Sequence, residues 1–504
     1  MKSKLLSFFF KSPSNWKFWL FMALAFKGIL FFCRIIQGSD DTWVIHGFWG
    51  YVAPDSRSYL WPIEDLIKSG TYGDAIRMPG YGAIYWFFRL FSSQAMACNF
   101  LILWQYILAS VSVYYLAMLA KNVTNNNYFF HSVFYLFLIS SFSNCMDQAL
   151  MTESLCTSFL IFTTYFFFEY FQSKKTYYLI LSGAILSWVI FLRPVFLLML
   201  LLYAGFLIFQ VYRLKLPILK ALLFFLSPFI FIDGLWIVRN YPIYHKAVPL
   251  TGKMFEAPEY RQSAVQFIQA WGGNYVEGDT RSLLFWFGYH NEYCKGFTGE
   301  EIPDNIYTSQ FNRDSLLNLK KLFISIQDSG ALYSANTNDL KCKLLISKFN
   351  KYTLSIKEER KFLYYIKAPL LYLKDIFILH WASYNVIGYS SYHVGLLNYY
   401  NNLNYIVTKL FHKINPINWL YMLFNYIIIA LGIVGIFLFL KDSLKNSFLL
   451  IFIILPLYTI LIHTIVLRQM DSRYLMPAWP FLIICASYCL YKTRNLPFQS
   501  TKIK

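Results

Sequence analysis

Apolar runs of about twenty residues recur along the chain, and shorter segments between them carry most of the charges. A helix needs about 20 apolar residues to span the hydrocarbon core of a bilayer. The runs therefore predict about ten transmembrane helices, at residues 16–36, 95–120, 127–146, 150–171, 176–192, 194–212, 217–238, 417–440, 447–467 and 474–491. Runs such as LLFFLSPFIFIDGLWIV lack the alternating polarity of strands in a membrane β-barrel.

Composition agrees with an all-α polytopic membrane protein, since 57% of the 504 residues are hydrophobic and only 14% are charged. Short cytoplasmic loops retain Lys and Arg. If the N-terminus is cytoplasmic, the loops on its side carry Lys121, Lys174, Lys175, Arg213, Lys215, Lys441 and Lys445. The charge pattern thus predicts that both termini are cytoplasmic. It also accounts for most of the net charge of +19, so we do not expect nucleic-acid binding.

Two long segments fall on the outer side and define three expected parts of the chain. These are an N-terminal transmembrane module at 1–238 with a first outer loop at 37–94, an extracytoplasmic region at 239–416, and C-terminal transmembrane helices with a cytoplasmic tail at 417–504. Within the middle part, residues 365–384 are amphipathic, and we expect them to lie along the outer membrane surface. Cys294 and Cys342 share this part, and they could form a disulfide in an oxidising compartment.

Charged residues gather near the predicted outer ends of the spans. A charge near a membrane is costly, so each one is a candidate for function. They are Asp55 and Arg77 in the first loop, then Asp147, Glu153, Arg193, Asp233, Arg239, Arg468, Asp471 and Arg473. Lys27 is the main exception, in the middle of the first span, where a lysine more often snorkels or forms a structural pair.

Several motifs near these charges occur in the order known from one enzyme family. PDSRSYL, IEDLIKSGTYG and RMPGYGAIYWFFRLF fill the first loop, followed by LMTESL, FLRPVF, WIVRNYPIYHKAVPLT and DSRYLMPAWPFL. In this order the chain resembles GT-C membrane glycosyltransferases related to glycosyltransferase family 39, which includes protein mannosyltransferases and the aminoarabinose transferases of lipid A. The resemblance covers the membrane portion, and residues 252–365 carry none of the pattern. It implies a GT-C fold with extracytoplasmic juxtamembrane helices and a mixed outer loop region.

The resemblance implies transfer of one sugar from a polyprenyl-phosphate donor to a hydroxyl of lipid A, another envelope glycan or a protein, outside the bacterial inner membrane. This reaction needs a carboxylate that accepts the proton of the attacking hydroxyl. Asp55 is the expected general base, although it could instead cap the helix that starts at Ser56, and Asp40 or Asp41 could take its role. Glu153 is the expected second acid, while Asp147 could be a solvated loop residue.

Arginines suit the donor phosphate because their planar guanidinium makes paired contacts with oxygen. Arg239 and Arg473 are the preferred candidates, with Arg193 and Arg77 next, although such arginines also bind lipid headgroups. Among many interfacial tyrosines, Tyr59 and Tyr81 lie beside these charges. No His or Cys cluster has zinc spacing. We predict no cofactor, and a divalent ion on the acids of the first loop stays open.

Three alternatives compete with transfer of a single sugar. An oligosaccharide transferase or polymerase would share the fold. A large external domain would favour that function, and the outer loop of this sequence is modest in size. A polytopic transporter or lipid flippase is compatible with the number of spans, yet it should place ionisable groups near the midplane. A non-catalytic scaffold of the same fold is a third alternative.

Overall fold

The computed structural model describes residues 11–37, 45, 47–50, 52, 55–70, 72, 78–245, 247–250, 259–273, 286–287, 302–328, 340–378, 416–443, 446–468 and 472–493. These residues form helices and connecting segments, with an isolated antiparallel β-bridge between Thr308 and Phe311. The chain divides into two compact units. The first contains Met1–Gly252, Leu379–Tyr458 and Leu475–Lys504, and the second contains Lys253–Ile378 and Thr459–Tyr474.

Seven helical segments of the described residues are long and apolar enough to cross a membrane, which confirms the expectation of an all-α, multi-pass membrane protein. They are α5 (Gln94–Thr124), α8 (Glu153–Ser173), Pro194–Arg213 with α10 (Leu197–Arg213), α11 (Ile218–Tyr244), α19 (Pro416–Ser443), Leu449–Val466 with α20 (Leu449–Leu461) and η5 (Ile462–Val466), and Ser472–Thr493 with η6 (Ser472–Ala478) and α21 (Trp479–Thr493).

Three further predicted spans form helices outside this set of seven. They are α2 (Trp16–Gln37), α6 (Asn127–Leu138) and α9 (Tyr177–Leu192). The structure divides the predicted span 127–146, because α6 ends at Leu138 and a short helix, α7 (Ser141–Asn144), follows. The Asn144 side chain donates to the Leu138 carbonyl over 2.9 Å, and so satisfies a helix-end acceptor that would otherwise be buried without a partner.

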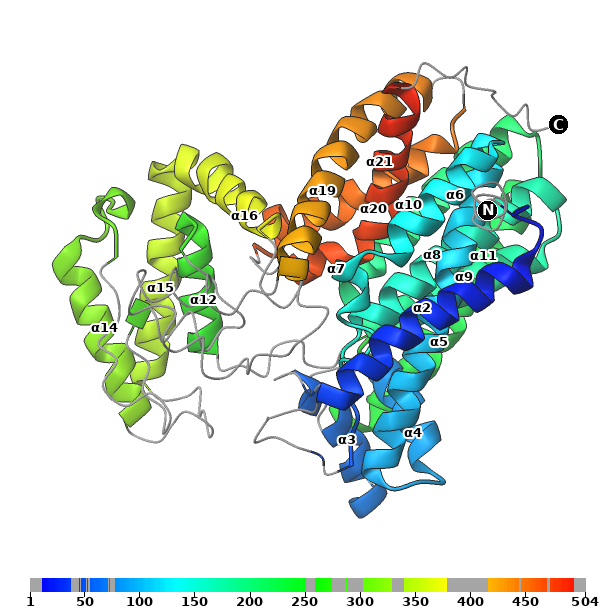
Figure 1. Ribbon diagram of the computed structural model, residues 1–504. Helices are drawn as coiled ribbons and strands as arrows, with labels where there is room; N and C mark the ends of the chain where they lie inside the picture. Colours follow the sequence, from blue (N-terminus) through cyan, green and yellow to red (C-terminus); the bar gives the residue numbers. More distant parts are fainter. Residues whose placement is uncertain are drawn as a thin grey trace. The chain divides into compact units, whose positions relative to one another are not determined.

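The helices of the first unit pack in a connected order (Figure 1). α5 contacts α2, α6 and α8, α8 packs on α9, and α9 packs on α11. α19 packs along α21, which also contacts α6. Glycines permit two of these close approaches, since Gly183 of α9 lies against the Phe225 carbonyl and Gly435 of α19 against the Cys485 carbonyl. Small residues at such crossings are the usual way in which membrane helices associate.

Two hydrogen bonds join helix ends of the first unit. Asn446 Nδ2 donates to the Val123 carbonyl over 3.1 Å, and Arg213 Nη1 donates to Ser447 Oγ over 2.8 Å. These bonds join the segments that follow α5, α10 and α19, all three of which the basic residues place on the predicted cytoplasmic side. The segments that carry the candidate site meet through other contacts, described below.

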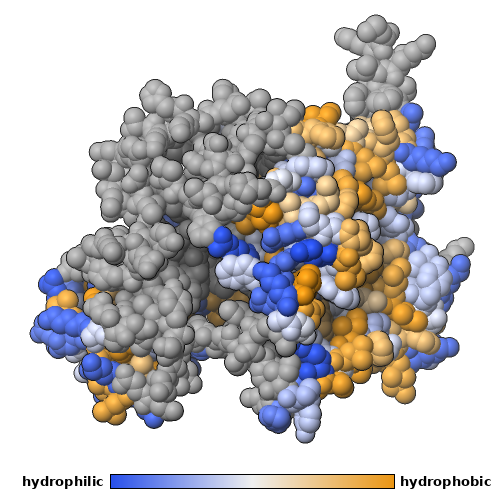
Figure 2. All heavy atoms as spheres, turned by 90° about the horizontal axis from the view of Figure 1, so that it is seen from below, coloured by the Kyte–Doolittle hydropathy of each residue, from blue (hydrophilic) through white to orange (hydrophobic). Residues whose placement is uncertain are grey.

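Hydrophobic side chains cover much of the outside of this unit. Figure 2, seen from below Figure 1, shows hydrophobic residues gathered on one broad side of the molecule and hydrophilic residues beside them. Among the large exposed hydrophobic residues are Leu201 of α10, Phe231 of α11 and Phe437 of α19. An apolar outer surface is expected of spans that contact lipid.

The second unit has a hydrophobic core of its own. It contains α12 (Glu259–Trp271), α14 (Arg313–Asp328), α15 (Leu340–Glu359), the short π-helix η3 (Leu363–Lys367) and α16 (Ala368–Ile376). α15 contacts both α12 and α14. Its core side chains include Phe267, Phe323 and Phe349. Cys342 is buried in this core, whereas Cys294 lies outside the described residues, so their disulfide stays a prediction.

The contact between α19 and α21 gives a direct test of the fold. Gly435→Ala adds a methyl group where the Cys485 carbonyl already lies, so we expect overpacking to lower the free energy of unfolding by about 1–3 kcal/mol. Gly205→Ala is the matched control, because a methyl group there meets no atom within 4 Å. Thermal unfolding of both purified variants measures the difference, and equal stability of the two would contradict this packing.

Candidate functional site

The first loop contributes the helix α3 (Ser56–Ser69), whose start is fixed to the segment before α8. The buried Ser56 hydroxyl donates to the Leu150 carbonyl over 2.8 Å. Asp55 therefore lies beside the segment that leads to Glu153. Asp55 occupies the N-cap position of α3, but its backbone is helical and its side chain makes no capping hydrogen bond.

A Pro-Gly pair brings a second loop helix, α4 (Pro79–Arg89), against the end of α9. A Cβ atom on Gly80 would lie 2.6 Å from the Phe191 carbonyl, so only glycine fits this contact without a shift. Pro79 suits the first turn of a helix, where no intrahelical partner for its missing N–H is needed. The Pro-Gly pair thus packs the loop directly against the residues that precede Arg193.

Glu153 and Arg193 form a buried ion pair. Arg193 Nη1 lies 3.1 Å from Glu153 Oε1, and the two side chains are 14% and 1% exposed. Glu153 is the first residue of α8, where the helix dipole favours a negative charge. Arg193 ends α9 in an extended conformation, which the following Pro194 enforces by steric restriction. The structure therefore brings together one predicted acid and one predicted cation.

Tyr81 of α4 lies near Glu153, and Tyr59 of α3 packs on Tyr81. Their ring centroids are 5.3 Å apart, and Tyr81 donates to Gln105 Oε1 over 2.8 Å. Burial raises the pKa of the Tyr81 hydroxyl well above its usual range, and nearby Cys98, Tyr59 and Glu153 raise the pKa further. Tyr81 is therefore a neutral hydrogen-bond donor at physiological pH.

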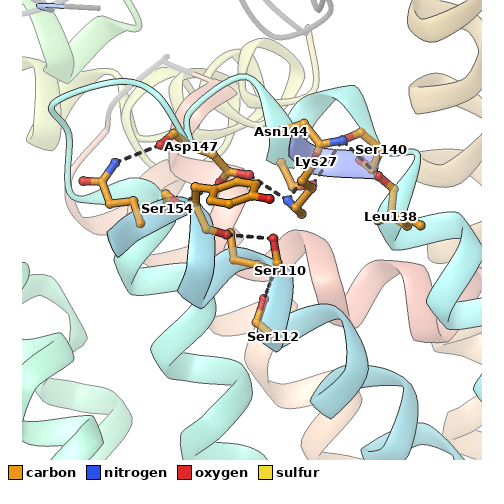
Figure 3. Close-up of polar contacts among 12 residues, drawn as sticks. Lys27, Ser110, Ser112, Leu138, Ser140, Asn144, Asp147 and Ser154 are labelled. Carbon is orange, nitrogen blue, oxygen red and sulfur yellow. Dashed lines mark hydrogen bonds and ion pairs between the residues drawn. The ribbon is translucent and has the colours of Figure 1, made fainter. Parts of the chain in front are cut away.

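A second buried ion pair fixes the segment between α6 and α8 (Figure 3). Lys27 Nζ lies 2.7 Å from Asp147 Oδ2 and donates to Asn144 Oδ1 over 2.6 Å. Ser154 donates to the other carboxylate oxygen of Asp147 over 2.7 Å. The expectation of a structural pair for Lys27 is confirmed. Asp147 is not a solvated loop residue, because a membrane lysine needs a buried partner there.

A small cavity adjoins this pair, lined by Lys27, Leu30, Phe31, Tyr106, Asn144, Asp147 and Gln148. Its volume of about 10 Å³ is close to the minimum for one water molecule. The cavity is therefore far too small for a sugar or a lipid phosphate.

Arg239 is held at the end of α11 by the first loop. Its Nη2 donates to the Tyr72 carbonyl over 3.1 Å, and its guanidinium lies 5.0 Å from the Tyr72 ring and 4.8 Å from the Trp236 ring. Burial raises the pKa of Tyr72 to about 12, although the charge of Arg239 acts in the opposite direction. Asp233, another predicted outer charge, accepts from the backbone N–H of Leu250 over 2.9 Å. The described contacts of Arg239 thus fasten loop segments together.

The remaining predicted residues are distributed as follows. Arg473 belongs to the second unit, where its guanidinium lies 5.3 Å from the Tyr474 ring. Its role in phosphate binding stays a prediction. The loop arginine, the alternative bases and one further acid lie outside the described residues, namely Arg77, Asp40, Asp41 and Asp471.

Sequence reasoning missed Glu64, a buried acid on α3. Its carboxylate accepts hydrogen bonds from the Tyr85 hydroxyl and from Arg89 Nε, the latter over 3.0 Å, and so joins α3 to α4. Its spacing could have indicated burial, because Glu64 follows the buried Leu60 by four residues and lies on the same helix face. Asp65, one residue further on, is exposed.

Within the described ranges, no group of three or more His, Cys, Asp or Glu side chains is arranged to hold a metal ion. No protein-family model and no curated protein matches this chain. The chemistry of the site therefore rests on its own geometry, in which Arg193 pairs with Glu153 and the residue after Asp55 is hydrogen-bonded to Leu150.

The Lys27 pair should be essential to stability. Lys27→Met leaves the Asp147 carboxylate buried without its cation, and we expect this to lower the free energy of unfolding by about 3–5 kcal/mol. Unfolding in mixed micelles with increasing dodecyl sulfate measures the loss.

Two comparisons sharpen this measurement. The double variant Lys27→Met, Asp147→Leu removes both charges and should recover much of the loss, because an uncompensated buried charge costs more than an absent pair. Lys68→Met on the exposed side of α3 is the control. Equal losses in the single and double variants would contradict an electrostatic role for the pair.

Proposed function

We propose that this protein is a GT-C glycosyltransferase of the bacterial inner membrane, with about ten spans, cytoplasmic termini and an extracytoplasmic site. It would transfer one sugar from a polyprenyl-phosphate donor to a hydroxyl of lipid A, another envelope glycan or a protein. The observation that carries the proposal is the buried Glu153–Arg193 pair, beside which the Ser56–Leu150 hydrogen bond anchors the residue after Asp55.

The proposed reaction is a single displacement with inversion. The acceptor oxygen bonds to the anomeric carbon as its proton passes to the Asp55 carboxylate, and the bond from that carbon to the phosphate oxygen breaks. The polyprenyl phosphate leaves with the bonding electrons. Stabilising that leaving group needs cations at headgroup depth. Arg193 meets this requirement, with Arg77, Arg239 and Arg473 as further candidates.

Glu153 has a different proposed role. Its carboxylate is 1% exposed and is paired with Arg193, which fixes its orientation. A carboxylate held in one orientation suits hydrogen bonds to sugar hydroxyls or to the acceptor. Tyr59 and Tyr81, which are buried and pack on each other, are proposed to support the wall of the sugar site from behind.

One observation favours a second candidate, a transporter or lipid flippase. The Lys27–Asp147 pair is a buried ionisable pair on a predicted span, a feature of many transport pathways. Transport would depend on Lys27 and not on Asp55. An oligosaccharide transferase or polymerase of the same fold would depend on Asp55, and only the mass of its product would distinguish it.

Loss of the proposed base gives the decisive test. Asp55→Asn keeps the shape of the side chain but removes the proton acceptor, so we expect sugar transfer to fall by about 100-fold or more. Intact mass analysis of envelope glycolipids and glycoproteins, from cells with and without the gene, first identifies the product. The transfer rate in membranes is then measured for each variant.

Asp65→Asn is the matched control, because Asp65 lies on the exposed side of the same helix and should transfer sugar at the normal rate. Full transfer by Asp55→Asn would exclude Asp55 as the base and direct attention to Asp40 and Asp41. Loss of product in Lys27→Met protein that remains folded, with full product in Asp55→Asn, would favour transport.

A further inference from the structure

The helical segment 361–378 of the second unit has one face turned into the core of that unit. Leu363, Ala368, Tyr372 and Ile376 are buried there, and the Tyr372 hydroxyl donates to the Gly273 carbonyl over 3.1 Å. η3 and α16 both contact α12. This face is therefore fully used by packing within the unit.

The opposite face carries large apolar side chains that the protein leaves exposed. Phe362, Tyr365, Ile366 and Leu370 are between 47% and 67% exposed. Their spacing of three or four residues places them in one stripe along the helix. Four adjacent apolar side chains of this size are costly to leave in water.

Lysines flank the stripe. Lys361, Lys367 and Lys374 are exposed, and Asp375 is the single acid between residues 361 and 378. An apolar stripe with flanking lysines is the pattern of a helix that lies in the headgroup region, with its apolar face in the acyl boundary. The excess of positive charge matches a surface rich in anionic lipid.

Contacts within the second unit also fix this segment at the end of a span. α16 contacts η5, the end of the apolar helical segment Leu449–Val466. Arg468, two residues further on, donates to the Tyr364 carbonyl over 3.0 Å and lies 4.0 Å from the Tyr364 ring. A helix fastened to the end of a span is at the depth of the membrane surface.

We propose that segment 361–378 is a lipid-binding surface of the second unit. Phe362, Tyr365, Ile366 and Leu370 insert into the headgroup and acyl boundary of the leaflet at which η5 ends. Lys361, Lys367 and Lys374 bind the phosphates of anionic lipids. The surface holds the second unit at headgroup depth whether or not the protein transfers sugar.

Spin-label accessibility in the full-length protein tests this proposal. Leu370→Cys carries a nitroxide label, and the accessibility of the label to oxygen is compared with its accessibility to a water-soluble nickel chelate. The protein is placed in nanodiscs of phosphatidylcholine with or without about 30 mol% phosphatidylglycerol. The signal of the labelled parent protein, which retains its native cysteines, is subtracted.

Two positions bracket the expected result. Phe231→Cys, on the span α11, reports a lipid environment, and Leu354→Cys, on α15 of the second unit, reports water. The ratio of oxygen to nickel accessibility at Leu370→Cys should exceed that at Leu354→Cys by about threefold or more. It should rise further with phosphatidylglycerol, and Lys361→Glu, Lys367→Glu and Lys374→Glu together should remove that rise.

A ratio at Leu370→Cys equal to that at Leu354→Cys in both kinds of nanodisc would overturn the proposal. Strong dipolar broadening between labels on two copies of the chain, with low accessibility to both reagents, would also overturn it, because the stripe would then bind a second copy. The oxygen-to-nickel ratio at Leu370→Cys could also be high but unchanged by phosphatidylglycerol and by the lysine substitutions. That result would overturn the proposal that the lysines bind anionic lipid.

Discussion

The low dielectric of the membrane is the constraint on which the candidate site depends, because each buried charge needs a partner of opposite sign. Lys27 on α2 meets this need with Asp147, and Arg193 after α9 meets it with Glu153. Both acids lie on the short stretch between α7 and the start of α8. Two helices that are distant in sequence thus hold this stretch by charge, and its backbone carbonyl at Leu150 then anchors α3.

The loop helices depend on this fixed stretch in turn. α3 begins at Ser56, bound to Leu150, and α4 packs through Gly80 on the residues before Arg193. Glu64 then ties the two loop helices together through Tyr85 and Arg89. The Pro-Gly pair that begins α4 is therefore part of the support of the site.

The positions of the seven long apolar helices could be predicted from the sequence, because a run of about twenty apolar residues has few alternatives in a bilayer. The order of the loops also placed Glu153 and Arg193 on one predicted side, and the structure pairs these two residues. The break of 127–146 after Leu138 could not, since it depends on the Asn144 side chain reaching a backbone carbonyl. The partner of each buried charge could not be predicted either, because Arg193 and Glu153 are forty residues apart and meet only through helix packing. Burial of Glu64 was missed because a carboxylate on an amphipathic helix is usually solvated.

The central claim is that the Glu153–Arg193 region receives the phosphate of a lipid-linked donor. A cryo-EM map of the protein in nanodiscs with a polyprenyl phosphate tests this claim most directly. The account predicts phosphate density within hydrogen-bond distance of Arg193, between Glu153 and the start of α3. Ordered lipid phosphate bound instead at the opposite helix ends, near Arg213 and Ser447, with an unoccupied Glu153–Arg193 region, would contradict it.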